Sequence, residues 1–255
     1  MGGIFYNLNR EDKTASVTFK GDSYYDYNEY SGEIVIPETV IVDGTRYSVT
    51  SLGYYCFCDC SSLTAITIPN SVTSLGDGCL AWCSSLTSIT IPNSVTSLGG
   101  SCFYGCSSLT SITIPNSVTS LRNDCFSGCS SLTSITIPNS VKSVGDYCFE
   151  GCSSLTSITI PNSVTSLGYS CFGGCSSLER IEVDAANTIY DSRENCNAII
   201  HTSTNELVVG CKNSKVPNSV TSLGDDCFRG CSSLTSISIP NSVTSMGARF
   251  FYGCI

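Results

Sequence analysis

Hydrophobic and polar positions follow one fixed order along most of the chain, and that order returns every 23 residues. In the copy that spans residues 86–106, the apolar positions are Leu86, Ile89, Ile91, Val95, Leu98, Cys102, Phe103 and Cys106. Prolines 23 residues apart mark the same period from Pro69 to Pro161, and Pro217 and Pro240 resume it. A period of this length is typical of a solenoid, in which each unit buries its apolar face only against neighbouring units.

Each unit contains one clear strand signal and one compact turn. Isoleucines alternate with Thr90 over residues 89–91, which is the period of a short β-strand, and Pro92 ends the strand because it lacks an N–H. The spacing of the cysteine and phenylalanine positions in residues 102–106 favours a helical or 3₁₀ turn. The predicted strands end near residues 36, 68, 91, 114, 137, 160, 183, 216 and 239. We therefore expect nine short parallel strands and little helix.

The repeat C-x-x-L-x-x-I-x-I-P-x-x-V-x-x-L/I-G-x-x-[A/C]-F-x-x-C resembles the treponemal, BspA-like class of leucine-rich repeats over about residues 32–255. The resemblance implies a right-handed superhelix with a parallel sheet on its concave face and short turns or 3₁₀ segments on its convex side. It also implies a surface protein of host-associated bacteria or some protists, several of which are linked to adhesion. One departure is that cysteine replaces the family's frequent alanine before phenylalanine in seven coils.

Three segments depart from the period, and two of them define the expected domain organisation. Residues 1–31 are predicted to form an N-terminal β-hairpin cap followed by a tyrosine-rich loop, and residues 32–255 the solenoid. A hairpin insert is expected at about 184–216, because this stretch contains ten residues more than one repeat. A further hairpin turn is predicted at Asp43-Gly44, which is a strong turn dipeptide.

Composition and charge narrow the function. The net charge of −9 and the absence of a Lys/Arg cluster argue against nucleic acid and anionic membranes as partners, and no apolar run is long enough for a membrane span. Residues 1–5 show no secretion signal. The single imidazole, His201, has no acid partner or nucleophile in a recognisable arrangement. We therefore expect no enzyme activity, no cofactor and no metal.

The 18 cysteines allow three interpretations. Seven pairs have the spacing C-x-x-x-C, which places their Cβ atoms ~6 Å apart within a helical turn, farther than a disulfide requires. Packed thiols that act as small apolar residues are favoured, with stacked disulfides and metal ligation as the alternatives. A separate candidate disulfide joins Cys196 and Cys211, which face each other if the insert's hairpin turn centres between residues 203 and 204.

Candidate binding residues lie in three places. The predicted set is Tyr24, Tyr25, Tyr27 and Tyr30 in the N-terminal loop, Glu179, Arg180 and Glu182 on one atypical strand, and Trp82, Tyr104, Tyr147 and Tyr169 in the variable turns. Exposed tyrosines favour recognition. The alternatives without a ligand are that the tyrosine loop fills space beside the cap, and that the turn residues drifted after the units were duplicated. A flat array of Thr and Ser hydroxyls on the strand surface is a further alternative site for a glycan, a protein or ice, or simply a well-paired strand surface.

These features predict a non-catalytic binding or adhesion module that recognises a host or matrix protein or a glycan. The alternative is a structural spacer in a longer surface protein with no ligand of its own. The protein is expected at the cell surface or outside the cell, and a cytosolic location is also compatible with the sequence. Residues 234–239 and the apolar residues after them are predicted to leave an open C-terminal edge, through which the chain could self-associate.

Overall fold

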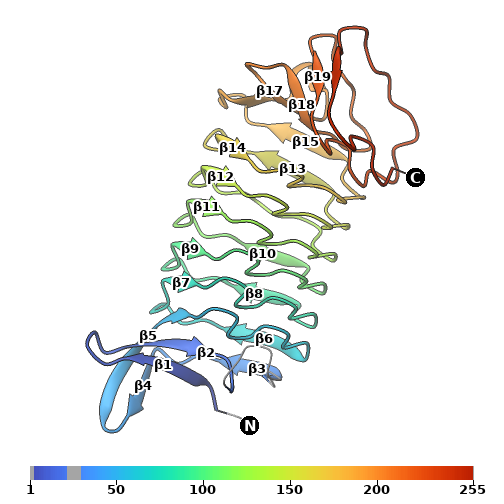
Figure 1. The fold of residues 1–255 in the computed structure, drawn as a ribbon. Helices are drawn as coiled ribbons and strands as arrows, with labels where there is room; N and C mark the ends of the chain where they lie inside the picture. The colour runs from blue at the N-terminus through green and yellow to red at the C-terminus, as the bar shows by residue number, and fades with distance from the viewer. Residues whose placement is uncertain (1–2, 22–29, 255) are drawn as a thin grey trace.

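A computed structural model describes residues 3–21 and 30–254 of the chain. These residues form an elongated stack of coils, with a hairpin at the N-terminal end and less regular coils at the C-terminal end (Figure 1). The one helix in the described residues is a 3₁₀ turn, η1 (Arg193–Asn195). The predicted β solenoid with little helix is therefore confirmed.

One side of the stack carries the predicted strand of each unit. This first ladder contains β3 (Gly32–Val35), β6 (Leu63–Thr67), β8 (Ser88–Thr90), β10 (Ser111–Thr113), β13 (Ser157–Ile160) and β15 (Arg180–Val183). The strands pair in parallel, and from β6 onward equivalent residues lie opposite one another, as Ile89 does with Ile112. The isoleucines point inward because alternate residues of a strand face opposite sides.

The prediction of nine such strands was too high. Three segments occupy the corresponding place in the repeat without forming a strand, namely residues 132–137, 211–216 and 234–239. At the first of these the ladder is loosened, since the N–H of Thr133 lies 3.4 Å from the carbonyl oxygen of Thr110. The other two follow the hairpin insert, where the preceding coil no longer offers a regular edge.

A second ladder, which the sequence analysis did not predict, runs along another side of the coils. Its two-residue strands are β7 (Ser74–Leu75), β9 (Ser97–Leu98), β11 (Ser120–Leu121), β12 (Ser143–Val144), β14 (Ser166–Leu167), β19 (Ser222–Leu223) and β20 (Ser245–Met246). Each is a Ser followed by an apolar residue, and glycine or Arg122 then begins the turn. Because such strands are too short to show alternation, periodicity could not reveal them.

Inward side chains from both ladders and the turns form columns that run the length of the stack. The phenylalanine column is the most regular: the rings of Phe103, Phe126, Phe149 and Phe172 stack with centroids 5.3–5.4 Å apart and interplanar angles of 2–6°. Most of these rings are fully buried. The core is therefore one repeated layer of contacts, as a solenoid requires.

The cysteines pack as thiols, as the favoured interpretation predicted. Sixteen of the 18 are buried, and the fifteen from Cys79 to Cys254 are in no disulfide. The second cysteine of a coil donates its S–H to the carbonyl of the preceding coil's phenylalanine position, as Cys129 does to Phe103 at 3.2 Å. Equivalent contacts of 3.0–3.3 Å are made by Cys83, Cys106, Cys152, Cys175 and Cys254. Cysteine thus fills a small apolar space and also satisfies a buried carbonyl.

In the segment where the hairpin cap was expected, β1 (Phe5–Asn9) pairs in antiparallel with β2 (Thr14–Thr18). Strand β2 pairs in parallel with β5 (Thr45–Leu52), so the hairpin covers the open edge of the second ladder. The Asp43-Gly44 turn joins β4 (Thr39–Val42) to β5, and both turn residues have positive φ. Asp-Gly is favoured there because the turn needs left-handed backbone at both positions.

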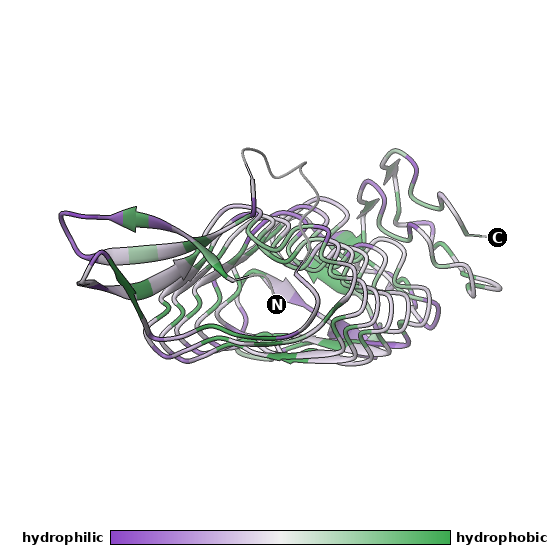
Figure 2. Ribbon diagram, turned by 90° about the horizontal axis from the view of Figure 1, so that it is seen from below, coloured by the Kyte–Doolittle hydropathy of each residue, from purple (hydrophilic) through white to green (hydrophobic). Residues whose placement is uncertain are grey.

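The predicted insert is a hairpin of β17 (Ile199–His201) and β18 (Glu206–Val209), preceded by β16 (Tyr190–Asp191). These strands lie in one sheet with β19 and β20, so three strands separate β14 from β19 on the side of the second ladder. On the side of the cysteine turns nothing separates the same two coils, because the N–H of Gly174 bonds directly to the carbonyl of Arg229 at 2.9 Å. The insert is therefore a wedge, and the last coils are displaced from the axis of the stack (Figure 2).

The candidate disulfide in this insert is not formed. Cys196 and Cys211 are separate buried thiols. A β-bulge between Ile199 and Ile200 shifts the register of the hairpin by one residue on the side of the bulge where the two cysteines lie. The sulfur of Cys211 instead donates to the carbonyl of Asn197 at 3.5 Å. The prediction assumed a regular ladder, and one extra residue removes the facing geometry.

The last coil is more exposed than the others, as the open-edge prediction expected. Phe250, Phe251 and Cys254 are only partly buried, and Met246 is 50% exposed. The apolar residues of 196–254 also form a cluster separate from the main core, apart from Ile199, Val208, Val209 and Cys211, which pack against the main core. Association through this end of the chain stays a prediction.

Candidate functional site

The variable residues of each coil lie on the turns between the second ladder and the second cysteine, and we call this surface the turn face. The residue before the first cysteine position has positive φ in every coil: Tyr55, Gly78, Ser101, Asp124, Tyr147, Ser170, Asp226 and Arg249. Bonds such as Tyr104 N to Ser101 O (3.1 Å) close tight turns, but the left-handed residues prevent the 3₁₀ segments that the sequence analysis allowed.

Four acidic or amide side chains on the turn face have a structural role. Their Oδ1 atoms accept the backbone N–H of the next coil at 2.6–3.0 Å, and they are Asp77, Asn123, Asp146 and Asp225. Each therefore links two successive coils across 23 residues. Part of the sequence variation between coils on this face therefore reflects whether a coil has an Asp or Asn that bonds to the backbone of the next coil.

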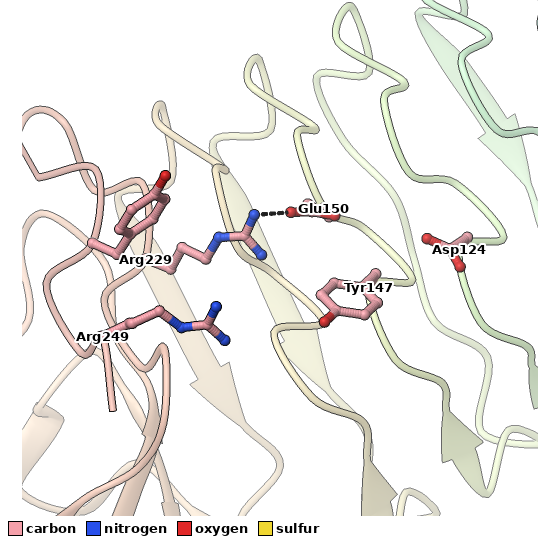
Figure 3. Close-up of a pocket in the computed structure, with 6 residues that line it drawn as sticks. Asp124, Tyr147, Glu150, Arg229 and Arg249 are labelled. Atoms are coloured by element: carbon pink, nitrogen blue, oxygen red, sulfur yellow. Dashed lines mark ion pairs between the residues drawn. The ribbon is translucent and has the colours of Figure 1, made fainter. Parts of the chain in front are cut away.

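The wedge-shaped insert brings distant parts of the turn face together and forms a recess of about 480 Å³. Its lining residues are Asp124, Tyr147, Glu150, Arg229, Arg249 and Tyr252. Asp124, Tyr147 and Glu150 come from coils before the insert, whereas the two arginines come from coils after it and point toward them (Figure 3). We call this the junction recess.

Ion pairs fix both walls of the junction recess. Arg229 contacts Glu150 at 2.5 Å, and Arg249 contacts Asp226 at 3.2 Å. Asp226 is 4% exposed; its Oδ2 accepts the hydroxyl of Tyr169, while its Oδ1 has no hydrogen-bond partner among the described residues. The guanidinium groups are thus held in place by carboxylates, which is a charge-assisted arrangement with defined geometry.

Two pKa values are shifted in and beside the junction recess. Partial burial and the neighbouring Asp146 raise the pKa of Asp124 above its ordinary value. The hydrogen bond to Asp226 raises the pKa of Tyr169, against the opposing effect of Arg249. Because both pKa values are raised, Asp124 and Tyr169 keep their protons to a higher pH than the isolated side chains do.

The structure separates the predicted binding residues into groups. Tyr147 lines the junction recess and its ring contacts Tyr169 at 5.4 Å between centroids, whereas Trp82 and Tyr104 lie on the same face nearer the N-terminus. On β15, Arg180 pairs with Glu182 at 2.5 Å. Glu179 pairs with Lys212 at 2.7 Å. Tyr24, Tyr25 and Tyr27 lie outside the described residues.

Tyr30 is a core residue, and its assignment to an exposed recognition loop was wrong. It is 6% exposed, its ring packs 4.8 Å from that of Phe57, and its hydroxyl accepts the N–H of Phe5 at 3.0 Å. Burial raises its pKa to about 12. Tyr30 ends the phenylalanine column beneath the cap, a position that composition alone could not distinguish from the loop before it.

Arg229, Arg249 and Tyr252 were not predicted as site residues. In the repeat, Arg229 and Tyr252 occupy the position of Glu150, and Arg249 occupies the position of Tyr147. The sequence signals that pointed to them were this shared position and the irregular insert that precedes them. In the described part of the chain no group of three or more His, Cys, Asp or Glu side chains is arranged to hold a metal ion. In residues 3–21 and 30–254 there is no helix with the length and hydropathy that a membrane crossing needs.

One column of the hydroxyl array on the strand surface makes contacts within the stack. Thr110 donates its hydroxyl to the carbonyl of Thr87 at 3.3 Å, and Thr133 and Thr156 repeat the contact at 3.5 Å. These bonds satisfy three donors of the array without a ligand. The observation supports the interpretation in which Thr stabilises the strand surface.

Comparisons with known proteins agree with this architecture. The family model described as BspA type leucine rich repeat region matches in six copies, over residues 27–130, 96–208 and 198–255. The fold is similar to a leucine rich cell surface protein from Faecalibacterium prausnitzii A2-165, with 29% identity and a TM-score of 0.71 over 95% of this chain and 70% of that chain.

Two further solved structures share the fold alone. A leucine-rich repeat protein from Eubacterium ventriosum has 21% identity and a TM-score of 0.67, with 99% of this chain and 64% of that chain covered. The pneumococcal vaccine antigen PcpA has 19% identity and a TM-score of 0.68, with 100% and 67% covered. No curated protein sequence matches the chain.

Proposed function

Because the chain belongs to the BspA-type leucine-rich-repeat family, we propose that it is a non-catalytic recognition module of a bacterial cell-surface protein. Its partner is a segment of another protein, bound in the junction recess. One observation carries the proposal: the insert gathers Tyr147, Arg229, Arg249 and Tyr252 from separate coils around one hollow of about 480 Å³.

The composition of the recess supports a protein partner. Tyrosine and arginine dominate the energetically important positions of protein interfaces, because they bring large contact areas and directional hydrogen bonds. Opposite charges stand on the two walls, with Asp124 and Glu150 facing Arg229 and Arg249. A polypeptide segment that carries both charge signs satisfies these walls, whereas a uniformly charged ligand meets repulsion from one of them.

The test is binding of the full chain to a panel of soluble host and extracellular-matrix proteins, measured by biolayer interferometry. For a protein that binds, Tyr252→Ala and Tyr147→Ala are expected to lower the affinity at least tenfold, as interface hot spots do. Ile41→Ala is the control, because Ile41 is 65% exposed on β4, at the N-terminal end of the stack and far from the recess (Figure 1). Equal affinity for the wild type and both recess variants would refute the assignment.

The structural-spacer function is the second candidate. It is favoured by the strand surface, whose hydroxyls bond within the stack and whose sequence hardly changes between coils. A spacer predicts no binding to any member of the panel. It also predicts that recess variants alter stability without any functional effect.

A further inference from the structure

Four aromatic residues form a second feature of the turn face, on the coils nearest the N-terminal cap. We define Tyr54, Tyr55, Trp82 and Tyr104 as the aromatic ledge. The rings of Tyr54 and Tyr55 meet edge to face with centroids 4.1 Å apart, and those of Trp82 and Tyr104 do so at 4.9 Å. The ledge spans three successive coils and shares no residue with the junction recess.

The backbone of Trp82 is strained. It has φ +62, in the left-handed region, at a position where six later coils carry glycine. A side chain in this conformation costs roughly 1–2 kcal/mol relative to a residue without a Cβ. Asp59, at the same position one coil earlier, has φ +58, so this turn accepts a side chain at that cost.

The rings of Trp82 and Tyr55 occupy space that is open only because the next coil has glycine beside each of them. A Cβ at Gly105 would lie 2.5 Å from the Trp82 ring, and one at Gly78 would lie 2.2 Å from the Tyr55 ring. Gly78 is the one glycine at its turn position, where the other coils carry larger residues. The two rings therefore pack closely against the backbone of the next coil.

The other side of the Trp82 ring faces solvent. Trp82 remains 51% exposed although it packs on both Gly105 and Tyr104. Burial of apolar surface stabilises a fold by about 25 cal/mol per Å². A larger neighbouring side chain would cover the exposed half of the indole and add that stability, but the chain leaves this half of the ring uncovered. The open ring is a platform fixed in one orientation.

From this geometry we propose that the aromatic ledge binds a neutral oligosaccharide. The C–H face of a pyranose carries partial positive charge and packs on the negative face of an aromatic ring. Successive coils are spaced at ~4.8 Å, which is comparable with the length of one pyranose unit, so a short oligosaccharide is long enough to span the three coils of the ledge.

The flanking polar group fits the same ligand. Asp59 is exposed and occupies the position of Trp82 one coil earlier, with its N–H bonded to Ala81 O at 2.8 Å. Its carboxylate accepts hydroxyl groups of a sugar stacked on the ledge. The same charge, and the net charge of −9, disfavour uronic and sialic acids.

Trp82 is the only tryptophan of the chain, so its emission reports directly on the ledge. The probes are hexasaccharides of β-1,4-glucose, α-1,4-glucose and β-1,4-N-acetylglucosamine, with hexagalacturonate as the anionic comparison. At least one neutral hexamer is expected to change the emission saturably at up to millimolar concentration, and hexagalacturonate is expected to have no effect.

Calorimetry of variants completes the test. Trp82→Gly restores the residue of the later coils, so it should remain folded and bind the sugar at least tenfold more weakly. Tyr252→Ala, in the junction recess, should bind the sugar normally, which separates this site from the proposed protein-binding recess. A flat titration with all three neutral hexamers, or full sugar binding by Trp82→Gly, would overturn the proposal.

Discussion

The coils between the N-terminal cap and the insert repeat one set of contacts, whereas the coils after the insert form a different set from nearly the same sequence. In the first region Phe126 and Phe149 stack at an interplanar angle of 5°, but Phe228 and Phe251 meet at 44°. Leu121 is 1% exposed in the first region, and its counterpart Met246 is 50% exposed in the second. A repeat thus keeps its regular packing only while each layer rests on an equivalent layer.

The same difference creates the features that a uniform solenoid lacks. Side chains on one face of a straight stack diverge from partners several coils away, so they contact only the adjacent layers. The tilt introduced by the wedge lets Arg229 reach Glu150 and Arg249 reach Tyr169, 79 and 80 residues away in the chain. Irregularity, not repetition, forms the junction recess.

Alkaline pH should have the largest effect, because buried thiols in both regions keep their protons only in the folded chain. Burial raises the pKa of Cys106 and Cys152 from the ordinary value of 9.0 to about 12, so the folded chain retains protons that the unfolded chain loses. Stability is therefore complete below about pH 9 and falls as the pH rises toward about 12, by on the order of 1.4 kcal/mol per thiol per pH unit. Circular dichroism in the presence of a reductant should show cooperative unfolding in this window.

The control for this titration is a variant in which Cys106, Cys129 and Cys152 are replaced by alanine. It should be less stable at neutral pH but should lose stability less steeply above pH 9, because three groups no longer ionise on unfolding. An identical pH slope in wild type and variant would show that other groups govern the transition.

Truncation of the phenylalanine column should separate the two regions next most strongly. Phe126→Ala removes a fully buried ring between two stacked neighbours and should lower the free energy of unfolding by about 3–5 kcal/mol. Phe251→Ala, in the partly buried last coil, should cost less than half as much. Urea denaturation measures both, and equal losses would contradict the contrast drawn between the regions.

Two glycine substitutions should sharpen the role of the junction. Gly151 and Gly230 have nearly the same φ, +69 and +70, but an added Cβ would lie 3.8 Å from Gly128 and only 2.5 Å from Gly174. Gly151→Ala should therefore cost about 1 kcal/mol from its backbone conformation alone, and Gly230→Ala about 1–3 kcal/mol more from steric overlap. Thermal melts of the pair test whether the turns at Gly174 and Gly230 are the contact point of the wedge.

The smallest expected effect concerns the carboxylates that link successive coils. Asp146→Ala removes the acceptor of the Tyr169 N–H, a bond of 2.7 Å, and should lower the free energy of unfolding by about 0.5–1.5 kcal/mol. Hydrogen exchange at the Tyr169 amide should accelerate in the same variant. Asp59→Ala, which removes an exposed carboxylate from another turn, is the control and should leave that amide protected.

The sequence by itself determined the solenoid, its inward columns and its two extra hairpins. Every layer offers the next one the same surroundings, so a local pattern such as Ile89 and Ile91 around Thr90 is sufficient to place residues in the core. The Asp43-Gly44 turn and the insert near residues 184–216 were also predictable, since both are local departures from a known period.

The tertiary structure decided what happens where layers are not equivalent. Tyr30 became a core residue because the cap's hairpin supplies its partners, and the bulge beside Ile200 separated Cys196 from Cys211. The junction recess depends on the angle between two parts of the stack. That angle follows from three strands placed on one side and none on the other. Contacts between distant residues such as Arg229 and Glu150 are set by this geometry, which no periodicity in the sequence encodes.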